Sequence, residues 1–438
     1  MLFSSNTFLF GFLPAVVVLY YLCPRRCRNV LLLVASLIFY GWGEPKYVLL
    51  MLVSILLNYF CGLAAARQQS RQRSTRGVLV LGVALNLGML GFFKYGKFFF
   101  GSAFPDIPLP IGISFYIFQA MSYLIDVCRR EVEVQKNVLT FGTYVTLFPQ
   151  LIAGPIVRYR DVAEMLESRR ENLPQFSRGV QRFVVGLSKK VLLANTFGAA
   201  WNALQVTTGT AAAWLGLLCY TLQIYFDFSG YSDMAIGLGQ LFGFTFLENF
   251  NYPYISASIT EFWRRWHISL STWFKEYVYI PLGGNRKGLA RQIFNILVVW
   301  LLTGLWHGAS WNFVLWGGYY AALLILEKCW LLKAGEKLPL VLRRMMTMVL
   351  VMLGWALFYF EDLGALGAFL GRLFTAVPSA GIAFYLPVTA LGCLCATPAL
   401  KRVKLPDGLR WGLCVVLLLL CVASLARQSY NPFIYFRF

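Results

Sequence analysis

The sequence predicts an all-α, polytopic membrane protein whose 438 residues form a single integral membrane domain, residues 1–438. Hydrophobic residues make up 58% of the chain and charged residues 13%, whereas soluble domains have roughly 45 to 50% apolar and about 25% charged residues. Apolar runs near the length of ~20 residues that a helix needs to cross a bilayer recur along the whole chain. No polar segment is long enough for a separate soluble domain, so these runs decide the fold class.

Twelve apolar runs are the candidate spans, and the first is predicted to be a retained span rather than a cleaved signal peptide. No Lys or Arg precedes it, and the sequence CPRR (23–26) follows where a cleavage site needs small residues. The stretch 138–157 contains Pro149 and Pro155, which predicts a re-entrant or broken segment. The twelve runs are residues 6–22, 29–42, 47–66, 77–100, 110–127, 179–200, 211–228, 291–306, 310–327, 345–360, 381–397 and 409–426.

The net charge of +20 is explained by membrane topology rather than by a nucleic-acid partner. Among the 39 Lys and Arg residues, 33 fall in seven clusters that share one side if the N-terminus faces outward and the chain crosses alternately. Cytoplasmic loops are enriched in basic residues, so this side is predicted to be cytoplasmic and both termini to lie outside. The same clusters would attract anionic lipid or an anionic cytosolic substrate.

The ten cysteines predict neither a disulfide framework nor a metal site. Most lie in apolar runs or beside basic clusters, and the close pairs 23/27 and 393/395 lack the further Cys or His that zinc requires. We therefore expect buried free thiols.

Only two histidines occur in the chain, and both lie in Trp-rich motifs. His267 ends the motif WRRWH (263–267), and His307 lies in LWHGASWN (305–312). Imidazole is the side chain whose ordinary pKa lets it accept or donate a proton near neutral pH. A lone buried histidine is usually structural, but a pair confined to two such motifs makes His267 and His307 the leading catalytic candidates.

The segment 256–280 is predicted to be one interfacial helix with an aromatic face. Its apolar residues recur at steps of three and four, while Arg264 and Arg265 fall elsewhere around the helix. Such a helix lies at the cytoplasmic interface with its Trp rings at headgroup depth, which would bring His267 to the rim of the membrane. The apolar face consists of Trp263, Trp266, Leu270, Trp273 and Tyr277.

His307 is predicted to lie deep, either at mid-membrane or at the floor of an invaginated pocket, because it joins two apolar runs. An ionisable residue at that depth is costly and marks a functional site. Burial keeps the imidazole neutral, as a general base for an attacking hydroxyl must be. The oxyanion formed by that attack needs donors, for which Asn312, Trp311 and the backbone around Gly308 are candidates. Glycines at 304, 308, 317 and 318 predict close approach of neighbouring helices.

Two carboxylates, Asp227 and Asp233, lie in an otherwise apolar run. Buried carboxylates need partners, and a structural pairing with an arginine such as Arg158 or with tyrosine hydroxyls is favoured over a catalytic role. The polar stretch 158–177 mixes both signs of charge, which predicts a solvated cytoplasmic helix.

Several motifs taken together resemble the membrane-bound O-acyltransferase (MBOAT) family, in its bacterial branch of alginate O-acetyltransferase membrane subunits and D-alanine transfer membrane proteins. The resemblance covers essentially the full chain and implies a bacterial cytoplasmic (inner) membrane. The matching motifs are MLFSS (1–5), FPQLIAGPIVR (148–158), YFDFSGYSD (225–233), YIPLGGNR (279–286) and the two histidine motifs.

The family fold implies a ring of about 11–13 transmembrane helices, with re-entrant and interfacial helices, around a central funnel. The resemblance implies that His307 is essential and that His267 lies on the cytoplasmic path of the donor. That donor funnel would include Trp266 together with Arg264, Arg265 and Arg286, and Arg286 could meet a phosphate. The donor would be a cytoplasmic thioester, acetyl-CoA in the leading interpretation, with no permanently bound cofactor.

The C-terminal sequence NPFIYFRF (431–438) is by composition a tail with an aromatic interface anchor. It also resembles the terminal motif of this branch and of a small partner peptide in the D-alanine system, in which the tyrosine is implicated as an acyl-receiving residue. On that resemblance, Tyr435 could take an acyl group and pass it to a partner.

The leading function is therefore acetyl transfer from a cytoplasmic thioester across the membrane for O-acetylation of a cell-surface or exported polysaccharide. The expected partners are an extracytoplasmic acyltransferase or hydrolase-like protein, the polysaccharide acceptor and membrane lipids, with no nucleic acid. The alternative within the enzyme class is D-alanyl transfer from a carrier-protein thioester toward teichoic acid. A transporter or flippase is the non-enzyme alternative, although the sequence lacks the internal symmetry typical of one.

Overall fold

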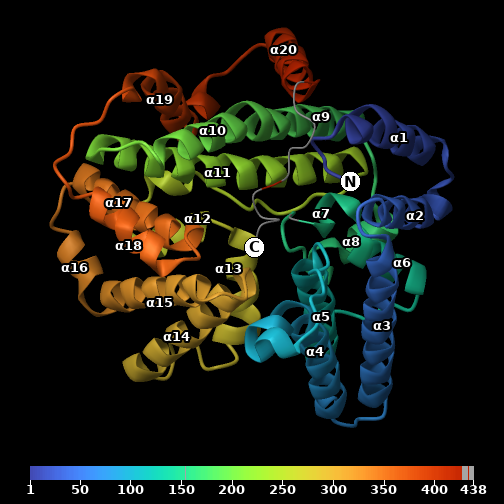
Figure 1. The fold of residues 1–438 in the computed structure, drawn as a ribbon. Helices are drawn as coiled ribbons and strands as arrows, with labels where there is room; N and C mark the ends of the chain where they lie inside the picture. Colours follow the sequence, from blue (N-terminus) through green and yellow to red (C-terminus); the bar gives the residue numbers. More distant parts are fainter. Residues whose placement is uncertain (153, 427–432, 434–438) are drawn as a thin grey trace. The chain divides into compact units, whose positions relative to one another are not determined.

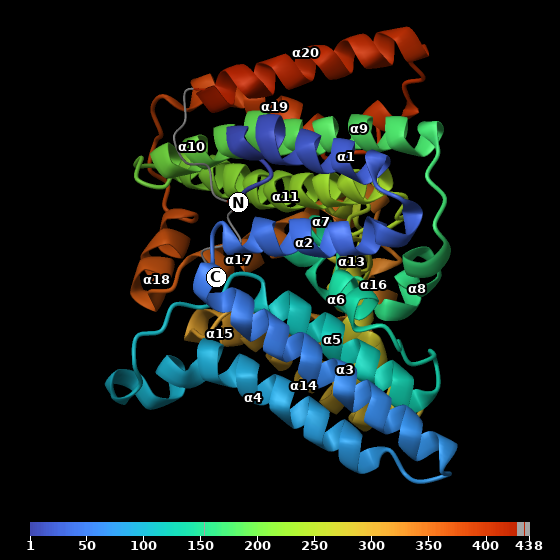
Figure 2. The same ribbon diagram turned by 90° about the vertical axis from the view of Figure 1, so that its right-hand side faces the viewer.

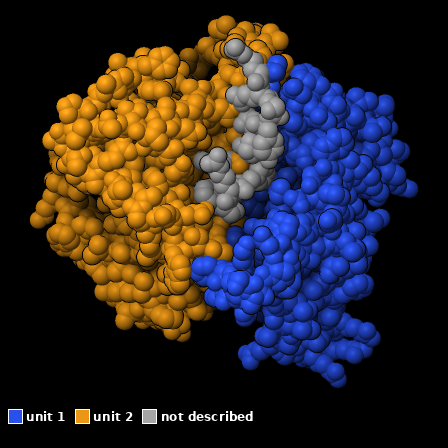
Figure 3. Space-filling model, viewed as in Figure 1, with its two compact units in different colours: residues 1–187, 231–248, 425–432 blue, residues 188–230, 249–424, 433–438 orange. Residues whose placement is uncertain are grey.

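The structure, a computed structural model, describes residues 1–152, 154–426 and 433. The described residues form helices and connecting segments and contain no strand, which confirms the all-α class (Figure 1). The chain divides into two compact units, coloured separately in Figure 3. Unit 1 comprises Met1–Leu187, Tyr231–Glu248 and Leu425–Pro432, and unit 2 comprises Ser188–Gly230, Asn249–Ser424 and Phe433–Phe438.

Unit 1 contains the N-terminal helices, of which α3, α4 and α5 pack side by side (Figure 2). Helix α11 (Thr210–Leu241) contributes residues to both units. The helices that begin in unit 1 are α1 (Leu13–Leu22), α2 (Arg28–Gly41), α3 (Val48–Ser70), α4 (Arg76–Phe100), α5 (Ile113–Arg129), α6 (Val138–Thr146), α7 (Phe148–Leu151), α8 (Tyr159–Ser168) and α9 (Leu173–Ser188).

Unit 2 contains both histidines, and its helices α14 and α15 pack against each other. Besides most of α11, its helices are α10 (Asn195–Leu204), α12 (Ile259–Arg265), α13 (Ile268–Phe274), α14 (Gly288–His307), α15 (Trp311–Leu326), α16 (Leu332–Gly335), α17 (Leu340–Tyr359), α18 (Leu363–Arg372), α19 (Leu386–Cys395) and α20 (Asp407–Ala426).

Within the described residues, six helices are long and apolar enough to cross a membrane by length and composition. The other predicted spans are also largely helical but shorter or more polar, such as α2 with 14 residues and α15 with 16. Whether these shorter helices complete a ring of 11–13 spans stays a prediction, as does the single domain over 1–438. The six segments are Pro45–Ser70, Arg76–Ala103, Thr210–Leu241, Gly288–His307, Leu340–Tyr359 and Asp407–Ala426.

The predicted break within 138–157 is confirmed. Helix α6 ends at Thr146, Leu147 leaves the helical conformation, and α7 lasts only from Phe148 to Leu151. Pro149 lies in the first turn of α7, where its missing N–H is tolerated because the first N–H groups of a helix have no partner within the helix.

The prediction of one solvated helix over 158–177 is wrong at residues 169–172, where the helix is interrupted. Helix α8 ends at Ser168, and α9 begins only at Leu173. In the connection between them, Arg169 and Glu171 have side chains only 6% and 7% exposed and form an ion-pair network. Side-chain hydrogen bonds, rather than helical backbone, therefore determine the conformation of this segment.

Glycines bring α14 and α15 into close backbone contact. A Cβ atom at Gly304 would overlap the carbonyl oxygen of Phe313, and one at Gly317 would overlap that of Trp300. At Gly308 the overlap would be with the Phe313 ring, whereas a Cβ at Gly318 would meet nothing within 4 Å. The predicted close approach is confirmed at the first three positions and wrong at Gly318.

The expectation of buried free thiols holds only in part. All ten cysteines are free, and Cys219, Cys414 and Cys421 are buried. In contrast, three others, Cys27, Cys329 and Cys393, are exposed. In a membrane protein such residues can face lipid, so an apolar sequence context does not imply burial within the protein.

Candidate active site

His267 lies at a break between two short helices (Figure 1). Helix α12 ends at Arg265, α13 begins at Ile268, and His267 has φ 44° and ψ 55°. The predicted continuous helix over 256–280 is therefore wrong, because the left-handed backbone at His267 interrupts it. A residue other than glycine costs on the order of 1–3 kcal/mol in this conformation, and such residues are concentrated at functional sites.

The segment that follows α11 imposes this break through its backbone. The N–H of Ile268 donates to the carbonyl oxygen of Asn249 at 3.0 Å, and the N–H of Asn251 donates to that of Arg265 at 2.9 Å. These bonds satisfy backbone groups on both sides of His267 that a continuous helix would pair internally. The conformation of His267 is thus set by contacts with residues far away in the sequence.

Asn249 also fixes the tautomer of the His267 ring. The backbone N–H of Ser269 donates to Asn249 Oδ1 at 3.2 Å, which identifies this atom as the amide oxygen. His267 Nδ1 lies 3.2 Å from the same oxygen, and since a carbonyl oxygen only accepts, Nδ1 must carry the proton. The lone pair is then on Nε2, which is buried without a hydrogen-bond partner in the described chain. The ring is therefore prepared to accept a proton at Nε2.

Burial keeps His267 neutral. The side chain is 1% exposed, and burial lowers the pKa of His267 from 6.5 to about 3, because an imidazolium loses its hydration in the protein interior. Phe228 of α11 packs edge-on against the imidazole with ring centroids 4.7 Å apart. The ring therefore lies in a dry aromatic environment, and its predicted position at the rim of the membrane stays a prediction.

Glu327 anchors the start of the helix that leads to His267. It lies in the π-helical turn after α15, and its carboxylate accepts the backbone N–H groups of Ile259 at 2.6 Å and Thr260 at 2.8 Å. These N–H groups lie in the first turn of α12 and have no partner within the helix. A carboxylate there also interacts favourably with the helix dipole. Glu327 thus holds α12 against α15.

The aromatic face of residues 263–277 points into the protein rather than to headgroups. Its five residues, Trp263 to Tyr277 at the predicted spacing, are all buried. Trp266 packs against Trp355 of α17, with centroids 4.8 Å apart, and against Phe250 at 5.0 Å. The periodicity of this face was predicted correctly, but its environment was not, since the partner rings come from distant parts of the sequence.

His307 is the last residue of α14 and is 6% exposed. Its ring packs edge-on against Trp316 of α15, with centroids 5.0 Å apart, and against Phe358 of α17 at 5.3 Å. Three helices thus contribute to one aromatic pocket around the imidazole. The predicted burial of His307 is confirmed.

Trp306 brings the two histidines into one site. Its indole centroid lies 5.1 Å from that of His307 and 6.0 Å from that of His267. Both imidazoles therefore contact the same side chain, although 39 residues separate them in the sequence. The sequence motifs predicted two separate environments, and the structure shows one aromatic site with two imidazoles.

The predicted oxyanion donors lie in different environments. Asn312 is fully buried, and its Nδ2 donates to the backbone carbonyl of Phe358 at 3.0 Å, so this amide connects α15 to α17. Trp311 is 66% exposed and therefore lies outside the buried pocket around His307. The donor role of Asn312 stays a prediction.

The predicted donor-funnel residues are not gathered at the histidines. Arg264 and Arg286 are exposed, and Arg265 forms an ion pair with Glu261 one turn earlier, with Nη2 and Oε1 2.9 Å apart. Trp266 belongs to the buried aromatic cluster described above. Binding of a donor by these four residues stays a prediction.

Both carboxylates of the YFDFSGYSD motif are in ion pairs, as predicted, but Arg158 is the partner of neither. Asp227 lies 2.5 Å from Lys190 Nζ, and both side chains are buried. Asp233 pairs with Arg182 at 2.8 Å. Arg158 instead pairs with Asp161, the residue with which it caps α8. The prediction failed because an arginine three residues from a carboxylate already has a local partner.

Tyr435 lies outside the described residues. Phe433, two residues earlier, is described and is 2% exposed. Its ring packs against Phe228 with centroids 5.8 Å apart. Because Phe228 also contacts His267, Phe433 packs on the same aromatic wall as the histidine site.

The sequence analysis missed Asn249 and Glu327. Asn249 belongs to the sequence ENFN (248–251), which follows the mostly apolar residues 242–247, and Glu327 is a carboxylate at the end of an apolar run. An isolated polar group beside an apolar segment was the available signal in both cases. Neither residue could be matched to its partner without the structure.

Relatives of the chain indicate the class of enzyme to which this site belongs. A relative from Pseudomonas putida, named "Probable alginate O-acetylase", is 42% identical over all of both chains. The peptidoglycan O-acetyltransferase of Helicobacter pylori is 35% identical over 83% of this chain and 78% of its own. The teichoic acid D-alanyltransferase of Streptococcus thermophilus is 30% identical over 51% of this chain and 58% of its own.

The profile of the membrane-bound O-acyltransferase family matches residues 34–333, which include both histidine motifs. The chain therefore belongs to the membrane-bound O-acyltransferase family. It is an O-acyltransferase, which moves an acyl group to a hydroxyl, and a multi-pass bacterial membrane protein.

Proposed function

We propose that the protein moves an acetyl group from a cytoplasmic thioester, acetyl-CoA, across the inner membrane for O-acetylation of a cell-surface or exported polysaccharide. The relatives named for O-acetylation of alginate and of peptidoglycan align with 100% and 83% of this chain. The D-alanyltransferase aligns with only 51%. The orientation with both termini outside, inferred from the basic clusters, would give the thioester access from the basic side.

One observation carries the chemical part of this proposal: Asn249 leaves Nε2 of a neutral, buried His267 available as a proton acceptor. A hydroxyl is a weak nucleophile near neutral pH and needs such an acceptor while it attacks a thioester. His307 contacts the same indole and is the general base in this proposal. His267 then accepts, at Nε2, a hydrogen bond from an N–H or O–H group of the incoming donor molecule.

In the transfer step, the acceptor oxygen bonds to the thioester carbonyl carbon as His307 takes the hydroxyl proton. The carbon–sulfur bond then breaks, and the imidazolium returns this proton to the departing thiolate. The products are an ester and a free thiol, and His307 is neutral again. The aromatic walls around both imidazoles exclude water, which limits hydrolysis of the thioester.

The acceptor hydroxyl in this proposal is that of Tyr435, and the acetyl ester it forms is passed to an extracytoplasmic acyltransferase or hydrolase-like partner. Support comes from Phe433, which packs against Phe228, the side chain that contacts His267. Tyr435 is two residues beyond this contact. A phenyl ester is more reactive than an alkyl ester, so the relay would retain an activated acyl group.

The test replaces Tyr435 by Phe and measures acetylation of the exported polymer at equal protein level. The change removes one oxygen and keeps the ring, so a tail that is only an interface anchor would tolerate it. We expect acetylation to be lost, and mass spectrometry of the wild-type C-terminal peptide to show a labile acetyl ester that is absent in His307→Ala. Normal acetylation by Tyr435→Phe would exclude the relay and require a direct acceptor.

D-alanyl transfer is the second candidate function, because a relative with that name matches half of the chain. Incubation of purified protein with labelled acetyl-CoA or with a D-alanyl carrier-protein thioester separates the two. We expect label transfer from acetyl-CoA alone. Transfer only from the carrier thioester would establish the second candidate instead.

A further inference from the structure

A basic cavity of about 560 Å³ lies in unit 1, away from the histidine motifs in sequence. Its size is within the range of roughly 300–1,000 Å³ found for small-ligand sites. It lies between the turn that joins α1 to α2, the start of α6, and the connection from α8 to α9. Five of its lining residues are arginines, namely Arg25, Arg26, Arg28, Arg169 and Arg170.

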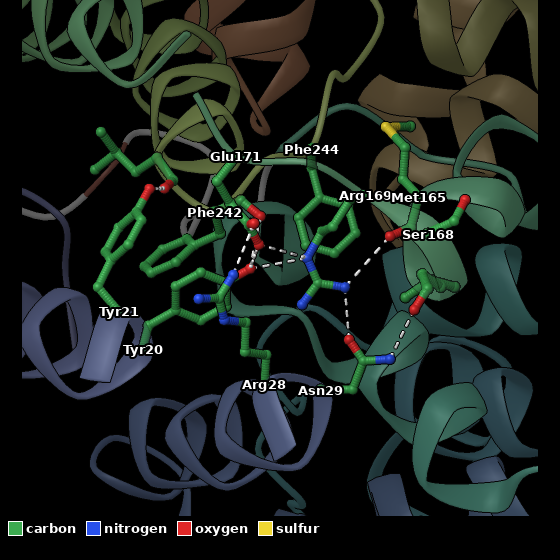
Figure 4. A network of polar contacts seen from close by, with 12 residues as sticks. Tyr20, Tyr21, Arg28, Asn29, Met165, Ser168, Arg169, Glu171, Phe242 and Phe244 are labelled. Carbon is green, nitrogen blue, oxygen red and sulfur yellow. Dashed lines mark hydrogen bonds and ion pairs between the residues drawn. The ribbon is translucent and has the colours of Figure 1, made fainter. Parts of the chain in front are cut away.

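Two of these arginines are fixed in orientation by a hydrogen-bonded network (Figure 4). Arg28 forms an ion pair with Glu171 at 2.7 Å. Arg169 donates from Nε to the Tyr20 hydroxyl at 2.9 Å and from Nη1 to Asn29 Oδ1 at 2.7 Å. The Tyr20 hydroxyl in turn donates to Glu171 at 2.5 Å. The guanidinium groups of Arg28 and Arg169 are therefore already ordered before a ligand enters, which lowers the entropic cost of binding.

The cavity has more positive than negative charge. Besides the five arginines it is lined by two carboxylates, Glu167 and Glu171. Burial alone would raise the pKa of Glu171, but the hydrogen bonds from Tyr20 and Arg28 outweigh it and lower this pKa, so Glu171 stays ionised at neutral pH. Glu171 and Glu167 together compensate at most two of the five guanidinium charges.

The excess charge is available to a ligand. Arg25, Arg26 and Arg170 are exposed, and no ion pair joins them to a carboxylate within the described residues. Arg169 Nη2 is buried and has no hydrogen-bond acceptor among the residues that the structure describes. Guanidinium groups bind phosphate oxygens through two parallel N–H bonds, which makes an arginine-rich cavity suited to a phosphate group.

The surfaces beside the cavity indicate which phosphate compound it takes. The turn with Arg25 and Arg26 joins two helices whose neighbouring faces expose large apolar side chains, among them Leu22, which is 77% exposed, and Val34, which is 50% exposed. In a membrane protein such faces contact acyl chains. A compound with a phosphate headgroup and acyl chains would thus satisfy the cavity and the helix faces together.

We propose that this cavity binds the headgroup phosphate of an anionic phospholipid, with the acyl chains along α1 and α2. The site is separate from acyl transfer, and the proposal does not depend on which acyl group is transferred. A soluble phosphate compound has the same charge but lacks the chains, so the two sources can be separated by experiment.

The experiment measures binding of phosphatidylglycerol and phosphatidylcholine to the purified full-length protein by native mass spectrometry. The cavity variant carries Arg25→Gln, Arg26→Gln and Arg170→Gln. The matched control carries Arg71→Gln, Arg73→Gln and Arg76→Gln, which removes the same charge from exposed arginines elsewhere in unit 1. Since all six residues are exposed, both variants should fold, and size-exclusion chromatography verifies this.

We expect wild type and control to prefer phosphatidylglycerol, and the cavity variant to bind it roughly tenfold to hundredfold more weakly, given the attraction that each basic residue adds near anionic lipid. Inorganic phosphate at equal concentration should not displace the lipid. Equal weakening in the control would overturn the proposal in favour of general surface charge. Displacement by inorganic phosphate would overturn the lipid assignment in favour of a soluble phosphate compound.

Discussion

The histidine site of unit 2 and the arginine cavity of unit 1 are both made of polar side chains, but burial has opposite consequences in them. His267 is buried among aromatic rings with one amide and one hydroxyl nearby, and its pKa falls to about 3. Glu171 is also buried, yet its pKa is lowered because a hydroxyl and a guanidinium donate to the charged form. One site thus contains a neutral base, and the other contains stable charges.

This difference suits two kinds of task. Proton transfer needs a group that can take a proton and return it, so a neutral imidazole in a dry pocket is appropriate. Recognition of an anion needs charges that persist and are already oriented, which the network of Tyr20, Arg28, Arg169 and Glu171 supplies. The chemistry of each site follows from the partners of its polar groups, since the side chains of His267 and Glu171 are both largely buried.

The largest effect is expected for His307→Ala. Loss of a positioned general base lowers a rate by roughly 10²- to 10⁴-fold, so acetylation of the polymer should fall by that factor at equal protein level. Arg71→Gln, an exposed change in unit 1, should leave the rate unchanged and is the control. A His307→Ala protein with wild-type acetylation would remove this residue from the mechanism.

A smaller loss is expected for Asn249→Leu, which removes the acceptor that holds the proton on His267 Nδ1. We expect the rate to fall roughly 10- to 100-fold, the size typical of groups that orient a functional histidine. Asn249→Asp retains an acceptor and should recover most of the rate. Its carboxylate favours the imidazolium, so the acid limb of the pH–rate profile should move to higher pH.

This pair of variants distinguishes a positioning role from a structural one. If Asn249 only stabilised the fold, the two variants would differ in protein amount but not in the pH–rate profile. Wild-type activity of Asn249→Leu would contradict the assigned tautomer. Neither outcome would change the interpretation of the arginine cavity, because these variants test only the histidine site.

The sequence predicted the class of fold because that information is local. Composition and apolar runs indicate membrane helices residue by residue, and Pro149 identified the break after α6. The break at His267 was missed since the aromatic periodicity continues through it, and the hydrogen bonds that impose it come from residues 249–251. The arginine cavity was missed for a similar reason. Adjacent charges at 169–171 are typical of a solvated helix, and only the contacts with Tyr20 and Arg28 reveal that the side chains of Arg169 and Glu171 are buried.

The smallest expected effect is a difference in how the two sites change the stability of the protein with pH. The unfolded chain protonates His267 near pH 6.5, whereas the folded protein does so only near pH 3. The free energy of unfolding therefore decreases as the pH falls from about 6.5 toward 3, by up to ~1.4 kcal/mol per pH unit. Glu171 also has a lowered pKa, but its contribution is fully present above its ordinary value of about 4.5 and is lost only below it. Between pH 6.5 and 4.5, the contribution of His267 to stability therefore changes with pH and that of Glu171 does not.

We therefore expect the melting temperature of the wild-type protein in detergent to fall between pH 6.5 and 4.5 more steeply than that of His267→Gln, which cannot titrate. His307 is present in both proteins, so the difference between the two curves reports on His267. Glu171→Gln should instead match the wild-type slope above pH 4.5 and become flatter than wild type below it, because its loss removes a group that titrates only there. Parallel curves for wild type and His267→Gln above pH 4.5 would mean that His267 is protonated as readily in the folded protein as in the unfolded chain. The contrast between a neutral imidazole in unit 2 and stable charges in unit 1 would then fail at its first member, because a charged His267 has no lone pair at Nε2 with which to accept a hydrogen bond.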